Sequence, residues 1–322
     1  MPNLILDDQI SFMKLTYFLI FLFCFELSIA QEESFISEDI SINNMIDGTL
    51  LFPERSKKAT LAIIIQGSGP TDRDGNQTNL KNNSLKFLAE GLYKKNIASF
   101  RYDKRLVKLI KEGKFKEEDA NFNDFIKDAK EVVSYFNKDD RFSKIIIIGH
   151  SQGSLVGMIA AQEVGVDKYI SIAGAGQEID DVVIDQLKVQ APNFVDSARK
   201  SFDDLRVYGV VQNYDSNLAT IFRPSLQPFM YSWMQYNPQT EIAKLKIPVL
   251  IINGDNDIQV QVSEAEKLKE AHPDAQLVII KNMNHIFKEI KGNMIENQQS
   301  YNNEEMAVMP KLIKTISSFI LK

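Results

Sequence analysis

The feature that most constrains this chain is a short turn, Gly149-His150-Ser151-Gln152-Gly153. The β-branched run at residues 144–148 precedes it and is typical of a buried parallel strand. Residues 155–161 follow it and have the composition of a helix. Gly-x-Ser-x-Gly between a strand and a helix is the pattern of a nucleophile elbow, in which the glycines leave room for a tight turn that exposes the serine hydroxyl. We therefore predict that Ser151 is a nucleophile and not simply a helix-capping serine.

Strands and helices alternate along most of the chain. Early strands are predicted within residues 44–52, and buried strands at residues 61–66, 97–102, 168–173, 248–253 and 276–281. Helices are predicted at residues 84–94, at residues 122–136, after a capping box at residues 263–266, and from about residue 310. This order predicts an α/β fold with a mostly parallel sheet and helices on both faces.

Residues 176–245 interrupt this alternation. They contain no buried β-run and are rich in aromatic residues, including the single tryptophan, Trp233. We expect a helical insertion that forms a cap. Two interpretations of the aromatic residues stay open, because they can pack the cap onto the edge of the sheet or form an apolar wall above Ser151.

A serine nucleophile needs a base, and the chain has three histidines. The alternation of the turn is expected to point His150 away from the nucleophile, and His272 lies where a helix is expected to end. His285 follows the strand predicted at residues 276–281, and active sites collect in loops at the carboxyl ends of parallel strands. We therefore predict that His285 is the general base.

The acid that orients this base is expected in the loop after residues 248–253. Asp255 and Asp257 both lie there, and we favour Asp257 because it sits deeper in the loop, next to apolar residues. The chain order Ser151, Asp257, His285 is the order nucleophile, acid, base. The oxyanion needs two N–H donors, for which we predict the backbone of Gln152 and of Ser68. No metal-ligand cluster and no cofactor-binding motif is apparent.

These segments resemble a known family. The chain is similar to the bacterial α/β-hydrolases of the EstD-type carboxylesterase group, which are related to serine aminopeptidase-like hydrolases. The resemblance lies in residues 67–76, 101–105, 149–153, 254–260 and 282–285, and it implies the triad Ser151, Asp257 and His285 with Ser68 and Gln152 as oxyanion donors. The chain departs from the family after Arg105, where Leu106-Val107-Lys108 stands in place of Gly-x-Gly. We interpret the lysine-rich residues 104–119 as a solvated loop or helix face.

The amino terminus has the layout of a secretory signal. A short basic segment from Met13, an apolar stretch and Ser28-Ile29-Ala30 predict a signal peptide at residues 13–30, a start at Met13 and a mature chain from Gln31. A membrane-anchoring helix is the alternative. The single cysteine, Cys24, lies in this signal. We therefore expect residues 1–30 to be an extension with a signal peptide, residues 31–322 to form an α/β-hydrolase domain with a cap at about 176–245, and the protein to be secreted or periplasmic.

Together these features predict a serine hydrolase that cleaves small carboxylic esters with short-to-medium acyl groups, without a cofactor. The net charge of −6 argues against a nucleic-acid partner, and no stable membrane insertion is expected once the signal is removed. A peptidase or thioesterase with the same triad is the alternative among enzymes. A binding protein that has lost catalysis on this scaffold is the alternative from another class.

Overall fold

The structure is a computed structural model, and it describes residues 35–53 and 58–322. The predicted signal peptide at residues 13–30 and the expected mature terminus at Gln31 lie outside the described residues. Within the described ranges, no helix is long and apolar enough to cross a membrane.

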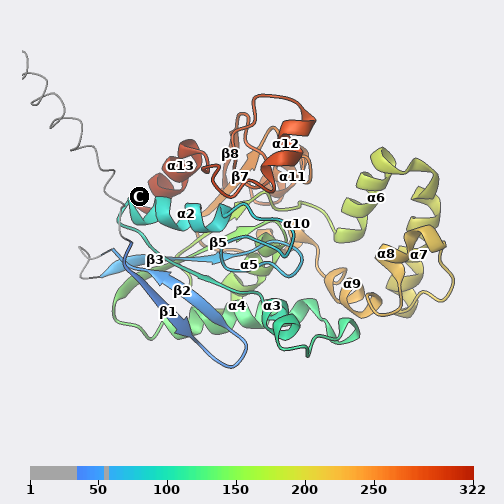
Figure 1. The fold of residues 1–322 in the computed structure, drawn as a ribbon, viewed down its shortest axis with the longest axis horizontal. Helices are drawn as coiled ribbons and strands as arrows, with labels where there is room; N and C mark the ends of the chain where they lie inside the picture. Colours follow the sequence, from blue (N-terminus) through green and yellow to red (C-terminus); the bar gives the residue numbers. More distant parts are fainter. Residues whose placement is uncertain (1–34, 54–57) are drawn as a thin grey trace, which may run out of the picture. The chain divides into compact units, whose positions relative to one another are not determined.

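One sheet of eight strands forms the centre of the fold, in the order β1-β2-β4-β3-β5-β6-β7-β8 (Figure 1). The strands are β1 (Ser37–Ser41), β2 (Asp47–Leu51), β3 (Ala59–Ile65), β4 (Ala98–Tyr102), β5 (Phe142–His150), β6 (Lys168–Ile172), β7 (Val249–Gly254) and β8 (Gln276–Ile280). β1 pairs antiparallel with β2, and β2 pairs antiparallel with β4. The pairs from β4 to β8 are parallel. The predicted α/β fold with a mostly parallel sheet is confirmed.

Helices cover both faces of this sheet. Successive side chains of a strand point to opposite faces, so each strand contributes to the core on either side. In β5, Ile145 and Ile147 belong to a core with α4 (Phe122–Phe136), α5 (Gln152–Glu163), α10 (Pro238–Ala243) and α11 (Val262–Ala271). Ile146 and Ile148 belong to a second core with α2 (Ser84–Tyr93) and α13 (Pro310–Ile320). In Figure 1, α2 and α13 lie above β3 and β5, and α4 lies below them. The all-apolar run of β5 is therefore explained by burial on both faces.

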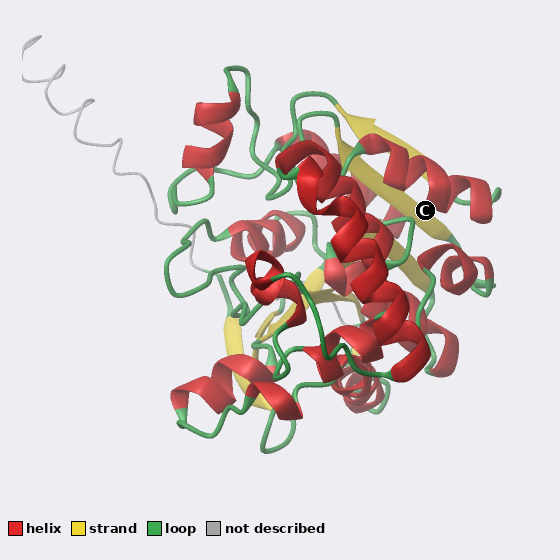
Figure 2. Cartoon of the chain, turned by 90° about the vertical axis from the view of Figure 1, so that its right-hand side faces the viewer, coloured by secondary structure: helices red, strands yellow, loops and turns green. Residues whose placement is uncertain are grey.

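The chain between β6 and β7 forms helices and contains no strand. In Figure 2 the side of the molecule that carries these helices faces the viewer. They are α6 (Ile179–Gln190), α7 (Val195–Tyr208), α8 (Ala219–Phe222), α9 (Gln227–Trp233) and α10, with short 3-10 turns between them. Buried aromatic residues such as Phe202 and Phe222 belong to a separate core of this segment. Trp233 instead stacks on Phe122 of α4, with 5.5 Å between the ring centroids. Much of the aromatic content of this segment thus serves packing.

Two local predictions are wrong, and one helix was not predicted. The first hairpin begins earlier than residue 44, because β1 covers Ser37–Ser41. The proposed capping box does not start α11: Gln261 is the N-cap, and Ser263 lies inside the helix. α12 (Met294–Ser300) was not predicted, whereas α3 (Arg105–Lys111) lies in residues 104–119, for which a solvated loop and a helix face were both left open. In α3 the apolar residues Leu106, Val107, Leu109 and Ile110 have helical spacing, but none of them is buried. α12 buries only two polar residues, and its sequence has no apolar stripe.

Candidate active site

Ser151 lies at a sharp turn between β5 and α5, as the sequence predicts. Its backbone has φ 54° and ψ −121°, a conformation that side-chain-bearing residues rarely adopt. The Ser151 N–H donates to the Ile172 carbonyl at 2.9 Å, which ties the turn to β6. A Cβ on Gly153 would lie 2.4 Å from the Ile65 carbonyl oxygen, and one on Gly149 would lie 2.3 Å from the Gly153 oxygen. Glycine at both positions is therefore a steric requirement of this turn.

The structure brings Asp257 and His285 together. His285 Nδ1 lies 2.8 Å from Asp257 Oδ2, and their side chains are 5% and 0% exposed. The other Asp257 oxygen accepts the backbone N–H groups of Gln259 and Val260 at 2.8 and 2.9 Å. With Nδ1–H donated to this carboxylate, the remaining ring nitrogen of His285 is free to accept a proton.

Asp255, the other candidate acid, is not part of this pair. It is exposed, and its Oδ1 accepts the backbone N–H of Asn282 at 2.6 Å. Asp255 thus braces the loop that leaves β8, while Asp257 contacts the histidine.

The other two histidines have different surroundings. His272 is the C-cap of α11, where the helix was predicted to end, and its Nε2 lies 3.2 Å from the Leu245 carbonyl oxygen. His150, expected to point away from the site, instead lines the same cavity as Ser151 and His285. Its Nε2 donates to the His285 carbonyl at 2.9 Å, so it holds the loop that carries His285. Burial, assisted by His285, lowers the pKa of His150 to about 3, which keeps its ring neutral.

The two predicted oxyanion donors lie on neighbouring segments. Gln152 is the first residue of α5, where a backbone N–H has no partner within the helix. Ser68 lies in the loop after β3. Its carbonyl accepts the Thr71 hydroxyl at 2.8 Å and the Gln77 amide at 2.9 Å, and these contacts fix the loop.

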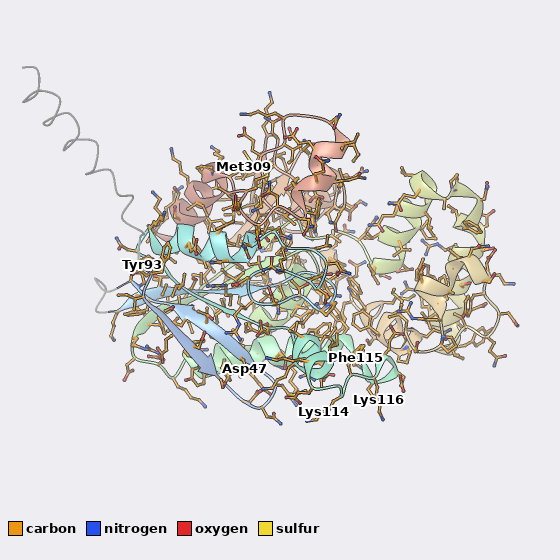
Figure 3. The ribbon with its side chains drawn as sticks, viewed as in Figure 1. Asp47, Tyr93, Lys114, Phe115, Lys116 and Met309 are labelled. Atoms are coloured by element: carbon orange, nitrogen blue, oxygen red, sulfur yellow. The ribbon has the colours of Figure 1, made fainter. Side chains whose placement is uncertain are left out.

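Lys104 joins these two segments, and this role of Lys104 was not predicted from the sequence. Its Nζ donates to the Gly67 carbonyl at 2.7 Å and to Gln152 Oε1 at 2.5 Å, and it lies 4.3 Å from the centre of the Phe125 ring. Lys104 is 5% exposed, and burial lowers its pKa to about 7. The interpretation of residues 104–119 as solvated is therefore wrong for this lysine. Lys114 and Lys116 are exposed at the outer edge of the fold (Figure 3).

Two cavities meet at Ser151, and Ser68 and Gln259 also line both. The larger measures about 270 Å³ and is lined by His285 together with residues of the loop after β3. The smaller measures about 110 Å³ and is walled partly by Ile179, Val182 and Trp233, which belong to the segment between β6 and β7. Among the described residues, no Asp, Glu, Lys or Arg lines either cavity, and no cluster of three His, Cys, Asp or Glu could hold a metal ion.

An elbow serine, a buried Asp–His pair and a mostly parallel sheet define an α/β-hydrolase site. The chain belongs to the family Hydrolase_4, described as serine aminopeptidase S33, which matches residues 84–290. The resemblance seen in the sequence is thereby confirmed.

Esterase EstD of Thermotoga maritima is 26% identical over an alignment of 271 residues, which covers 79% of this chain and 60% of that protein. This chain thus spans about three fifths of that relative's length.

Solved structures show the same fold. Est1E from Butyrivibrio proteoclasticus matches with a TM-score of 0.57 and 17% identity, over 89% of this chain and 98% of Est1E. The Pyrococcus furiosus esterase Pf2001 matches with a TM-score of 0.51 and 17% identity, over 89% of this chain and 92% of that one. At these identities the likeness concerns the fold alone.

The contacts of the two aspartates predict different effects of the same substitution. We expect Asp257→Asn to lower kcat by about 10³- to 10⁴-fold, because it removes the carboxylate that fixes the His285 tautomer. Asp255→Asn keeps an oxygen that can accept the Asn282 N–H, and we expect its kcat to stay within about tenfold of wild type. Steady-state kinetics on one ester measures both, and the reverse ranking would contradict the geometry.

The contacts of Lys104 predict that it positions the oxyanion donors. Removing a donor outright costs about 10²- to 10³-fold in kcat, so loosening both segments in Lys104→Met should lower kcat by at least about tenfold with little change in KM. Lys168→Met is the matched control. Lys168 also donates to two carbonyl groups and lies 5.2 Å from a phenyl ring centre, but at the start of β6, away from the elbow. An equal loss in both variants, or a rise in KM alone, would rule out this role.

Proposed function

We propose that this protein hydrolyses carboxylic esters through an acyl-enzyme formed on Ser151. The observation that carries the proposal is the buried 2.8 Å contact between Asp257 and His285 beside a cavity that Ser151 also lines. In this mechanism, His285 Nε2 removes the proton of Ser151 as its oxygen attacks the ester carbonyl. The N–H groups of Ser68 and Gln152 stabilise the oxyanion, and His285 then protonates the departing alcohol. Water activated by His285 releases the acid.

The uncharged linings of the two cavities favour an ester substrate over a peptide or a coenzyme A thioester. An aminopeptidase must bind the α-ammonium group of its substrate, and burying that charge without a carboxylate is costly. A coenzyme A thioester carries phosphates, for which Arg or Lys side chains are the usual partners. Among the described residues neither cavity has a charged lining side chain. A neutral ester makes no such demand.

Two comparisons support the same class. The Thermotoga maritima relative is named an esterase. Est1E, which has the same fold, has also been solved with ferulic acid bound. Both facts concern other proteins, and they agree with an acid or acyl group as the ligand here.

The proposal includes export from the cytoplasm. The basic, apolar and small-residue segments at residues 13–30 support a signal peptide that is cleaved before Gln31. The protein would then act as a secreted or periplasmic enzyme.

A substrate panel tests the proposed activity. We expect p-nitrophenyl acetate and butyrate to be cleaved with a kcat/KM at least about tenfold above those for aminoacyl p-nitroanilides and acyl-coenzyme A, because the cavities offer no partner for a charge. Ser151→Ala should lower kcat on the esters by at least about 10³-fold. A preference for aminoacyl or coenzyme A substrates would assign the triad to a peptidase or thioesterase.

Processing of the amino terminus tests the proposed export. Expression of the full chain in a bacterium, followed by amino-terminal sequencing, should give Gln31 or a residue close to it in the extracellular or periplasmic fraction. Cytoplasmic protein that begins at Met1 or Met13 would contradict the proposed signal.

A further inference from the structure

We propose that Asn297 of α12 is a positioning residue for the reaction. Its side-chain amide joins the loop that carries Asp257 to the loop that carries His285 and holds the two in the geometry that their contact requires. This inference rests on the proposed function, and it adds a residue that orients the proposed acid and base without touching the substrate.

The sheet alone does not fix the position of the acid relative to the base. Pairing between β7 and β8 ends at Gly254 and Ile280, before either functional residue is reached. Beyond that point, the Asn256 N–H donates to the Met283 carbonyl at 3.1 Å, and the Asn256 side chain donates to a carbonyl further along the same loop. Neither contact holds the Asn256 carbonyl, which belongs to the planar peptide unit that leads into Asp257.

The Asn297 side chain holds this carbonyl and the other loop at once. Its Nδ2 donates to the Asn256 carbonyl at 2.8 Å, and its Oδ1 accepts a side-chain N–H of Asn284 at 3.0 Å. Asn256 directly precedes Asp257 in the chain. In the same way, Asn284 directly precedes His285. One amide therefore links the neighbours of the acid and the base, and we call this link the Asn297 bridge.

The partners of Asn284 fix the direction of the bridge. The Asn284 Oδ1 accepts the N–H groups of Ile286 and Lys288 at 3.2 and 2.9 Å, so Asn284 holds the backbone on the far side of His285 as well. Because that oxygen is occupied, the Asn284 NH₂ group must face α12. Asn297 then receives it through its oxygen, which leaves the NH₂ group of Asn297 to donate to the other loop. Each amide thus has a single orientation that satisfies its partners.

Burial makes the bridge rigid and specific. Asn284 and Asn297 are each 1% exposed, so a broken hydrogen bond would leave buried polar groups unpaired. Ser300 Oγ also accepts from the Asn284 NH₂ group, at 2.8 Å, so α12 stays attached to that loop when Asn297 is truncated. The link that Asn297→Ala removes is therefore the one to the loop that carries Asp257.

Truncation of Asn297 should change the rate of catalysis and not the binding of substrate. We expect Asn297→Ala to lower kcat for p-nitrophenyl butyrate by at least about tenfold, because a small displacement of the acid from the base is costly. KM should stay within about twofold, because Asn297 is not among the described residues that line either cavity at Ser151.

Asn293→Ala is the matched control on the same helix. Asn293 caps α12 by accepting the N–H groups of Ile295 and Glu296 and takes no part in the bridge. Its loss should weaken the helix but keep kcat within about threefold of wild type. An equal loss of kcat in Asn293→Ala and Asn297→Ala would contradict the proposal.

A double-mutant cycle separates positioning from a purely structural role. In Asp257→Asn the carboxylate that the bridge orients is absent, so adding Asn297→Ala should lower kcat by less than about twofold. A structural defect would instead lower kcat by the same factor in both backgrounds, and that result would overturn the proposal. Expressing kcat per active site titrated with a fluorophosphonate removes the contribution of unfolded protein.

A second variant carries the same test if Asn297→Ala does not fold. Asn297→Asp keeps the volume of the side chain and an acceptor for Asn284, but it places an oxygen instead of NH₂ against the Asn256 carbonyl. We expect a loss of kcat of at least about tenfold that falls below about twofold in the Asp257→Asn background. A kcat equal to that of the wild type would show that the bridge does not position the pair.

Failure of this inference can be told apart from failure of the proposed function. If Ser151→Ala and Asp257→Asn abolish ester cleavage but Asn297→Ala does not lower it, the bridge has no positioning role and the esterase assignment stands. If no ester is cleaved above the level of Ser151→Ala, both are wrong.

Discussion

Close packing at the start of α5 is the constraint on which the site depends. Gly153 allows the first turn of α5 to lie against the end of β3, because a Cβ at this position would meet the Ile65 and Gln66 carbonyl oxygens at 2.4 and 2.6 Å. The same approach places the Gln152 backbone beside the loop that carries Ser68, and Lys104 bridges the two through Gly67 and the Gln152 side chain. A larger residue at 153 would force these segments apart, so the nucleophile and both proposed oxyanion donors share one steric origin.

The electrostatics of the site follow from burial. His150 is held neutral, and its Nε2 donates to the backbone carbonyl of His285. The carboxylate that contacts the His285 ring is Asp257, which is buried with it. The Lys104 ammonium lies outside both cavity linings and interacts with neutral oxygens and a phenyl ring. A substrate therefore meets no charged side chain among the described residues that line the two cavities, which is the physical basis for proposing a neutral ester.

Much of this architecture was predictable because it rests on regular patterns. The β-branched residues at 144–148 predicted β5. Ser151, Asp257 and His285 each follow a predicted strand, and the loops at the carboxyl ends of parallel strands are where active-site residues are expected. Lys104 was not predictable in this way, because a contact across 37 residues between a side chain and the Gly67 carbonyl has no sequence period, and a lysine in a charged stretch resembles a solvated one. Likewise α12, which Asn293 caps at its start and Tyr301 at its end, buries no apolar residue, so its sequence does not indicate a helix.

The central claim is that Ser151 is the nucleophile of an acyl-enzyme, and covalent labelling tests it most directly. The purified protein is treated with a fluorophosphonate, and its intact mass and tryptic peptides are then measured. The account predicts one adduct per chain, located on Ser151, formed rapidly by the wild type and much more slowly by Asp257→Asn, in which the tautomer of His285 is no longer fixed. An unlabelled Ser151, or an adduct on another residue, would contradict it.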